Sequence, residues 1–192
     1  METDEDLELP QSLTAAMAFV LDVLRSEPWK HCFDLEPYPT FLSAEATDRS
    51  FGPISPECER PSDHFRIFGQ EGAGGHMAFW LARPGAALTD QPVVFLGSEG
   101  EAVVIARDLS DLLWLLAQGY GPVEAGMPEW RRADWAAVER PELVAIAEQH
   151  APGRRRPAQE LVAAAQQEFP DFERYYLAKW CPEVAALAPH SV

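Results

Sequence analysis

The residue types that most often do chemistry are few and poorly paired in this sequence. No two histidines stand at His-x-x-x-His spacing and no Cys-x-x-Cys occurs, so a locally built zinc site is not predicted. Asp63-His64 could supply part of a catalytic triad and His31-Cys32 a thiol–imidazole pair, but neither has a partner nearby in the sequence. We therefore expect no catalytic residue, no metal and no cofactor. A hydrolase would require His64 or His76 to reach both a nucleophile and a carboxylate in a cleft.

Two glycine-rich segments have the composition of functional loops but the wrong context. Residues 72–75 (Gly-Ala-Gly-Gly) precede a strand pattern that begins at His76, whereas a phosphate-binding loop precedes a helix. Residues 97–100 (Gly-Ser-Glu-Gly) lack the Gly-x-Ser-x-Gly pattern of a nucleophile elbow and also precede a strand. Both segments are predicted to be turns between antiparallel strands, because glycine accepts a positive φ without a Cβ penalty.

Three carboxylates lie in or beside these two turns. Glu71 belongs to the first turn, and Glu99 and Glu101 belong to the second. Turn tips are exposed, and exposed carboxylates on a rigid sheet suit electrostatic pairing with a basic protein surface. We predict a partner-binding site here, the alternative being that these acids are scattered surface charges. The predicted site residues are Glu71, Gly72, Gly74, Gly75, Glu99 and Glu101.

Short apolar runs in the middle of the chain predict the strands that position the turns. They are rich in Val, Ile, Phe and Trp and are bounded by Gly or Pro. The last three are apolar in both alternating sets, so the sheet needs cover on both faces. We expect a central, mainly antiparallel sheet of about four to six strands flanked by helices. The predicted strands are residues 64–68, 76–82, 92–96 and 101–106.

Helical spacing of apolar residues predicts the layers around the sheet. Residues 12–26 form an amphipathic stripe, and Asp108 is placed to cap a nearly all-apolar helix that ends at Gly119, with Asp111 adding favourable charge in its first turn. Six prolines in residues 28–62 predict an irregular connection. After Pro128 the periodicity predicts helices over 128–139, 141–150, 157–169 and 171–180.

Length and composition favour one α+β domain over residues 1–192. A chain of 192 residues with 47% hydrophobic residues can bury a core, so disorder of the whole chain is excluded. We expect a core over about residues 10–125 and a C-terminal helical extension over about 126–185.

The formal net charge is −16, from 15 Lys and Arg against 31 Asp and Glu. Nucleic acid is not expected as a direct ligand, because its binding requires clustered cations. The charge favours a basic partner or serves solubility. The one basic cluster, the three arginines at 154–156, predicts a solvated loop between helices, with an anion-docking site as the alternative.

Cysteine usage and the N-terminus favour a cytoplasmic protein without membrane contact. Cys32, Cys58 and Cys181 are odd in number and far apart, as expected for reduced thiols. The first residues are acidic rather than the cationic start of a secretory signal. The apolar stretch over 13–24 is too short to span a bilayer.

The middle of the chain also carries an ordered series of motifs. A Gly-rich turn leads to a strand ending near Trp, followed by a strand opening with Pro-Val, an acid-containing turn, a further strand and a leucine-rich helix. These motifs occupy residues 68–80, 92–101 and 104–117. The series resembles the SUKH superfamily, and within it the branch related to the yeast cell-wall assembly regulator Smi/Knr. The N-terminal helix with its Pro-rich sequel and the long helical region after residue 125 depart from the usual pattern of that family.

The resemblance implies an α+β fold without known catalytic residues. For many bacterial members it implies an immunity protein that binds and neutralises a toxin domain, and such toxins are often nucleases with basic surfaces. We therefore predict a non-enzymatic protein-binding domain of the immunity type, which its negative charge suits. The alternative is an intracellular regulatory or scaffold protein that docks partners through its C-terminal helices, with Tyr175, Tyr176 and Trp180 as the docking patch.

Overall fold

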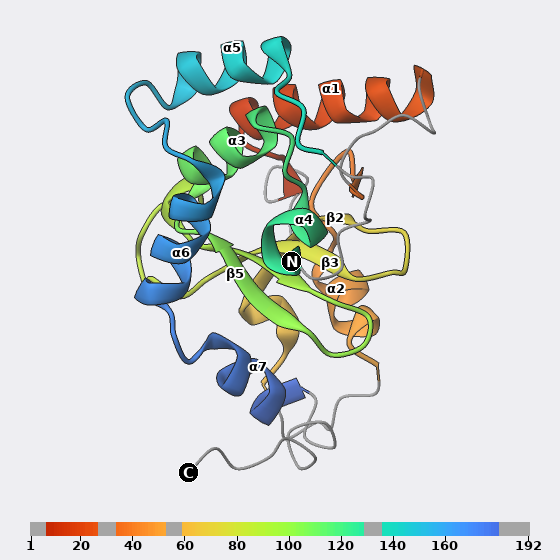
Figure 1. The fold of residues 1–192 in the computed structure, drawn as a ribbon. Coiled ribbons are helices and arrows are strands. Elements are labelled where there is room, and N and C mark those ends of the chain that lie inside the picture. The colour runs from red at the N-terminus through yellow and green to blue at the C-terminus, as the bar shows by residue number, and fades with distance from the viewer. Residues whose placement is uncertain (1–6, 27–33, 53–58, 129–135, 181–192) are drawn as a thin grey trace.

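The computed structural model describes residues 7–26, 34–52, 59–128 and 136–180. Within these ranges the helices lie around one sheet (Figure 1). The N-terminal half contains α1 (Gln11–Ser26), β1 (Glu36–Pro37), α2 (Ala44–Ser50), β2 (Phe65–Gln70), β3 (His76–Trp80), β4 (Val93–Leu96) and β5 (Ala102–Ala106). The C-terminal half contains α3 (Leu109–Ala117), α4 (Pro122–Gly126), α5 (Pro141–His150), α6 (Ala158–Glu168) and α7 (Phe172–Trp180).

The five strands form one antiparallel sheet in the order β1-β2-β3-β4-β5. This confirms the predicted α+β class and the predicted antiparallel sheet. β2 continues to Gln70, beyond its predicted end, and pairs there with His76 of β3. The edge strand β1 lies in the Pro-rich connection and was not predicted. It pairs Pro37 with Gly69, and an edge is where a sheet tolerates proline, which cannot donate to a ladder.

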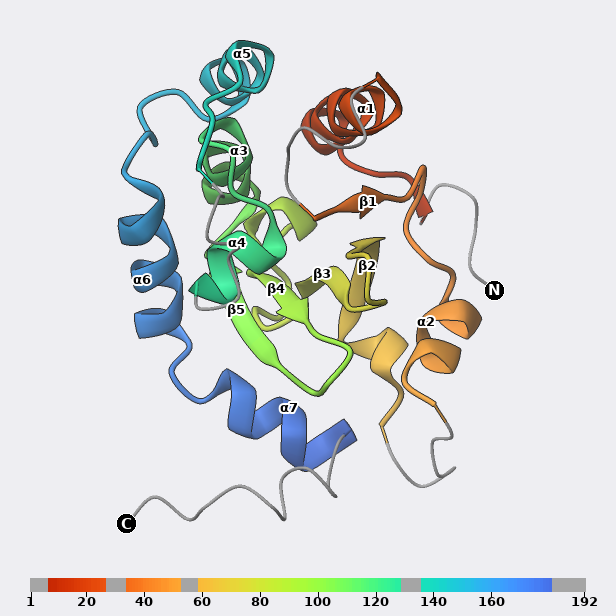
Figure 2. The same ribbon diagram turned by 45° about the vertical axis from the view of Figure 1, so that its right-hand side comes forward.

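Both faces of the sheet are buried, as the doubly apolar strands predict. On β3, Met77 and Phe79 enter one hydrophobic cluster and Ala78 enters the other. On β4, Val93 and Phe95 likewise oppose Val94. Helices α1, α3 and α5 form the layer over the first face, and α7 lies across the opposite side (Figure 1, Figure 2).

The C-terminal helices complete both clusters. Leu143 of α5 and Leu161 of α6 are fully buried in the first cluster, together with α1 and α3. Phe172 and Tyr176 of α7 are buried in the second, against β2 and β5. The C-terminal helical part therefore supplies core to the sheet on both sides.

The helix predicted to follow Asp108 is present and buried. The Asp108 carboxylate accepts a hydrogen bond from the Asp111 backbone N–H at 2.9 Å, which caps α3. Gly119 has φ of +82°, and a Cβ there would lie 2.6 Å from the carbonyl oxygen of Val138. Only glycine fits this position, which confirms it as the point where the chain leaves the helix.

Two predicted segments differ from the structure. The connection over 28–62 holds the short helix α2 besides β1, and the Ser43 hydroxyl caps α2 by accepting from the Ala46 N–H at 3.2 Å. Much of the helix predicted over 128–139 falls on residues 129–135, outside the described residues, and 136–140 are irregular. The helical prediction is therefore wrong for 136–139. The predictions over 12–26, 141–150, 157–169 and 171–180 are confirmed as α1, α5, α6 and α7.

Candidate functional site

The two predicted turns lie side by side at one end of the sheet. His76 pairs with Gln70 and with Leu96, so the β2–β3 and β4–β5 turns emerge together. They are also packed against each other. A Cβ on Gly75 would lie 2.8 Å from the Leu96 carbonyl oxygen and 2.9 Å from the Gly97 Cα. The structure therefore brings Glu71, Glu99 and Glu101 to the same end of the sheet.

Glu71 is buried, which corrects the prediction that its carboxylate is exposed. Its Oε1 accepts a hydrogen bond from the Gly75 N–H at 2.7 Å, and its Oε2 accepts from the Ala73 N–H at 2.6 Å. The backbone N–H groups of Ala73 and Gly75 point into the turn, and the Glu71 carboxylate accepts a hydrogen bond from each of them. Gly74 completes the turn with φ of +98°, and Gly72 and Gly74 are exposed. Glu71 thus holds the turn rather than facing a partner.

The second turn uses a similar device and leaves one acid free to face solvent. The Glu101 Oε2 accepts a hydrogen bond from the Glu99 N–H at 3.2 Å, so this half-buried side chain folds back across its turn. The Glu99 side chain at the tip is exposed, as predicted.

Three further carboxylates join this end of the sheet, and sequence reasoning missed them. Asp34 accepts from the Gly72 N–H at 2.9 Å, and Glu36, opposite Gln70 in the register, accepts from the Gln70 Nε2 at 3.0 Å. Glu124 of α4 accepts from the Gly121 N–H at 3.1 Å. Asp34 and Glu36 lie in the Pro-rich connection, where no strand pattern marked them. We name this surface the acidic end, formed by Asp34, Glu36, Glu71, Glu99, Glu101 and Glu124.

No arginine or lysine belongs to the described segments that build the acidic end, which are 34–38, 69–76, 96–102 and 120–128. Asp34, Glu36 and Glu99 are exposed. A carboxylate has about four lone-pair directions, so one backbone hydrogen bond leaves it able to accept others. The arrangement can therefore receive cationic groups from outside.

Burial perturbs the pKa of Glu124 and of His76, which directly follows the first turn. Desolvation raises the pKa of Glu124, and the neighbouring Asp34 charge adds to the increase. Desolvation lowers the pKa of His76, against the opposing effect of Glu71. The His76 Nδ1 is buried and has no hydrogen-bond partner among the described residues. At this end of the sheet, burial therefore disfavours the charged forms of Glu124 and His76.

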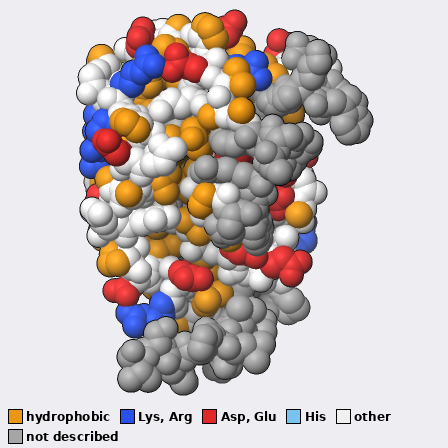
Figure 3. Space-filling view, viewed as in Figure 1, with side chains coloured by type: hydrophobic (Ala, Val, Ile, Leu, Met, Phe, Trp, Pro, Cys, Tyr) orange, Lys and Arg blue, Asp and Glu red, His pale blue; other side chains and the backbone are white. Residues whose placement is uncertain are grey.

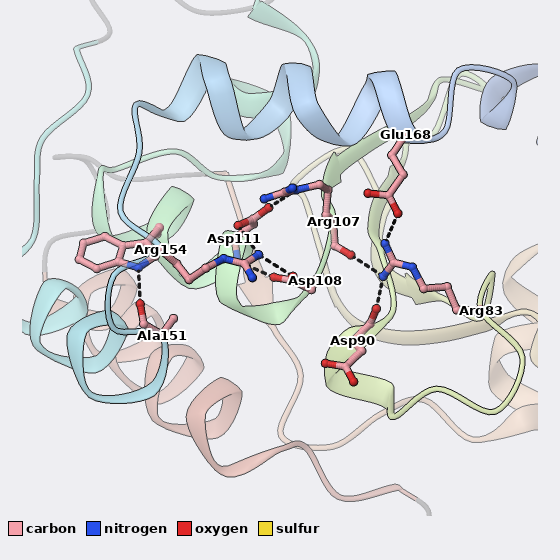
Figure 4. Close-up of polar contacts among 9 residues, drawn as sticks. Arg83, Asp90, Arg107, Asp108, Asp111, Ala151, Arg154 and Glu168 are labelled. Carbon is pink, nitrogen blue, oxygen red and sulfur yellow. Dashed lines mark hydrogen bonds and ion pairs between the residues drawn. The ribbon is translucent and has the colours of Figure 1, made fainter.

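The arginine cluster at 154–156 lies in the loop between α5 and α6, as predicted, and Arg155 is exposed, but Arg154 is half-buried and paired within the chain (Figure 4). The Arg154 Nη2 donates to the Asp108 Oδ2 at 2.6 Å and to the Asp111 Oδ1 at 2.9 Å. The Arg107 Nε donates to the Asp111 Oδ2 at 2.7 Å, and the Asp111 side chain is fully buried. These four residues, Arg107, Asp108, Asp111 and Arg154, are the Arg154 network.

The second arginine of the cluster is also engaged within the chain. The Arg155 Nη2 donates to the Glu139 Oε2 at 2.6 Å, and its guanidinium lies 5.4 Å from the centre of the Trp114 ring. Arg83 makes a comparable bridge, donating to the Arg107 carbonyl at 2.8 Å and to the Asp90 carbonyl and the Glu168 carboxylate (Figure 4). Arg83, Arg154 and Arg155 thus tie loops to helices, so two of the three arginines of the cluster are already paired within the chain.

His64 approaches the arrangement that would suggest a hydrolase, but in a closed cluster. Its Nε2 lies 2.5 Å from the Glu59 Oε2, and its Nδ1 lies 3.3 Å from the Tyr175 hydroxyl. Lys179 also binds Glu59 at 2.5 Å, and Trp180 packs on the imidazole at 5.4 Å between ring centres. Both ring nitrogens are therefore occupied. His31 and Cys32 lie outside the described residues.

The aromatic docking patch of the scaffold alternative is largely part of the core. Tyr176 is buried, and Tyr175 and Trp180 are half-buried. The Trp180 ring lies 5.2 Å from Phe65 and 5.9 Å from Phe51, measured between ring centres. These side chains hold α7 on the sheet, so no specific contact favours the scaffold alternative.

Among the described residues, no group of three or more His, Cys, Asp or Glu side chains is arranged to hold a metal ion. Within the same residues, no helix combines the length and the apolar character needed to cross a membrane. Comparison with protein-family models, with curated proteins and with solved structures finds no match.

Proposed function

We propose that this protein is a non-enzymatic protein-binding domain whose acidic end binds a basic protein surface. The observation that carries the proposal is the convergence of six carboxylates from four separate segments without an arginine or lysine in those segments. Such a concentration of like charge costs stability, and a cationic partner relieves that cost.

The rigidity of the acidic end supports the same proposal. Glu71 and Glu101 each fix a turn by accepting backbone N–H groups, and Asp34 ties the segment before β1 to the first turn. A surface held in place before binding loses little conformational freedom when the partner arrives. Glu36 and Glu99 then stand exposed at fixed positions on this frame.

The class of partner that we propose is a toxin domain, which makes the protein an immunity-type protein. The resemblance of residues 64–120 to the SUKH superfamily supports this class, and the net charge of −16 agrees with it. Nuclease toxins bind polyanionic substrates and therefore present basic surfaces. An acidic domain that covers such a surface blocks the substrate by occupying the same cations.

The test is co-expression with the protein encoded beside this gene. We expect that protein to arrest growth alone, the arrest to be relieved by this chain, and the dissociation constant to rise with NaCl concentration. Glu99→Lys should weaken binding about tenfold, because it places a cation against a basic surface. Glu148→Lys, an exposed reversal on α5, is the matched control and should leave binding unchanged. Absence of binding, or binding insensitive to salt, overturns the proposal.

A further inference from the structure

An open groove lies between α4 and α6 on the face shown in Figure 3, where hydrophobic side chains line the space between these helices. Its volume is about 240 Å³. Pockets for small-molecule ligands usually hold about 300–1,000 Å³. The groove therefore has room for one side chain rather than for a cofactor. Among the residues that line it are Tyr120, Ala125, Gly126, Ala158, Val162 and Ala163.

Small residues border the groove on both helices, beside the longer side chains of Tyr120 and Gln159. A Cβ on Gly126 would lie 3.3 Å from the Ile105 Cγ2 and 3.5 Å from the Val103 Cβ, so α4 rests on β5 through its backbone. On the opposite side, α6 contributes Ala158, which is buried, and Ala163, which is exposed. The Gln159 Nε2 donates to the Tyr120 hydroxyl at 3.0 Å along the groove, and the small side chains leave the remaining space open.

The groove adjoins the acidic end. A Cβ on Gly126 would lie 3.5 Å from the Val103 Cβ, and Glu101 lies two residues before Val103, just before β5 begins. Residues two apart in sequence are at most about 7 Å apart along an extended chain. Glu124 lies on α4 itself, one residue before the groove-lining Ala125. In Figure 3 acidic side chains also gather at the lower right, where the β4–β5 hairpin ends.

We propose that the groove receives one apolar side chain, of the size of leucine, from a basic segment of the partner. The charge of the neighbouring acidic end selects this occupant, because cations two or three residues from the apolar side chain would reach its carboxylates. The inference rests on the proposed function and specifies the chemistry of the partner. An apolar anchor in a small pocket beside charged contacts is a common source of affinity and register.

Two labelled peptides, GKKGLGKKG and GKKGGGKKG, test the proposal by fluorescence anisotropy with the full chain. Both carry four lysines, and only the first carries the apolar anchor. We expect both to bind more weakly as NaCl increases, and the leucine peptide to bind about tenfold more tightly, as burial of one leucine side chain provides.

Matched variants separate the groove from the acidic end. Ala163→Phe fills the groove from α6 and should abolish the preference for leucine while leaving the glycine peptide unaffected. Ala145→Phe, the same change at an exposed position of α5, should alter neither affinity. Glu99→Lys should weaken both peptides. In the wild-type chain, the leucine peptide should also shift the amide NMR resonances of Gly126 and Ala163, which keeps the test valid if Ala163→Phe fails to fold.

The outcomes distinguish the two proposals. Equal affinity for the two peptides, with salt-dependent binding that Glu99→Lys weakens, overturns the groove and leaves the proposed function standing. If neither peptide binds, both the groove inference and the proposed function are overturned. A dimer that Ala163→Phe converts to a monomer assigns the groove to a second copy of the chain and also overturns the inference.

Discussion

The acidic end and the Arg154 network both gather carboxylates, but they hold them in opposite ways. In the Arg154 network, Asp108 and Asp111 are paired with Arg154 from the α5–α6 loop, and Asp111 also with the adjacent Arg107. At the acidic end, Asp34, Glu71 and Glu101 accept hydrogen bonds from backbone N–H groups. Arginine pairing cancels charge, whereas a backbone N–H only fixes the position of a charge that remains.

This difference separates charge that serves the fold from charge that is available for binding. Asp111 is fully buried between two guanidinium groups and cannot reach a partner protein. Glu36 and Glu99 are exposed beside other carboxylates. We therefore expect substitutions in the network to change stability, and substitutions of the exposed acids to change binding.

Asp111→Ala should have the largest effect on stability. It leaves Arg107 and Arg154 without their shared buried partner, and loss of one side of a buried pair commonly costs about 3–5 kcal/mol. Both arginines are partly exposed and can regain water, so we expect a loss of about 2–3 kcal/mol in the free energy of unfolding, measured by urea denaturation.

The counterpart of Asp111→Ala at the acidic end is the removal of an exposed carboxylate. Glu99→Ala removes an exposed carboxylate and should change the free energy of unfolding by less than about 0.5 kcal/mol. If Glu99→Ala destabilised the chain as much as Asp111→Ala, the distinction between the two regions would be wrong.

Gly75→Ala should have the next largest effect, because it disturbs the packing of the two turns. The new Cβ would meet the Leu96 carbonyl oxygen, the Gly97 Cα and the Glu71 Oε1, each within 3.0 Å. Two of these atoms are backbone and cannot move independently, so we expect a loss of about 1–2 kcal/mol in thermal or urea unfolding. Gly72→Ala meets only the Asp34 carboxylate, at 3.3 Å or more, and is the matched control. An equal loss in both variants would argue against tight packing between the turns.

The core elements of the fold could be predicted because their signals are local. Each of these elements has its own apolar periodicity, which can be read from its own residues alone. They are β2 to β5 and α1, α3, α5, α6 and α7. β1 and α2 could not be predicted in the same way. β1 is two residues long and is defined by pairing with Gly69 and Gln70, which lie over thirty residues further along the chain.

The site was predicted less completely than the fold, because its burial depends on tertiary contacts. The sequence indicates that Glu71 and Glu99 occupy turns, but the inward backbone donors that bury Glu71 appear only once the turn is formed. The neighbours of Arg154 in the sequence indicate a solvated loop, yet its guanidinium binds Asp111, which lies 43 residues earlier in the chain. Pairing over such distances depends on how α3 and the α5–α6 loop meet.

Glu124→Gln should change stability in a pH-dependent way. Burial raises the pKa of Glu124 above 4.5, so the folded state holds a proton that the unfolded state has released. This contribution to stability is therefore lost as pH rises from 4.5 through the raised pKa. The variant should lose this slope and be more stable at pH 7, by about 1 kcal/mol or less, in urea denaturation from pH 4 to 8. An unchanged slope would contradict the assignment to Glu124.

His76→Gln should have the smallest effect and the opposite slope. Burial lowers the pKa of His76 below 6.5, so as pH falls from 6.5 the unfolded state takes up a proton that the folded state refuses. The wild-type chain therefore loses stability as pH falls below 6.5. The variant should lose less, so that its free energy of unfolding falls by about 0.5 kcal/mol less than that of the wild type on going to pH 5. Hydrogen bonds to Asp111 raise the pKa of Arg107 and Arg154 above their already basic values, so both guanidinium groups stay charged throughout the same titration. If His76→Gln left the acid limb of the stability profile unchanged, the pH sensitivity of the fold would have to lie outside the acidic end, and the contrast between the two regions would extend only to binding.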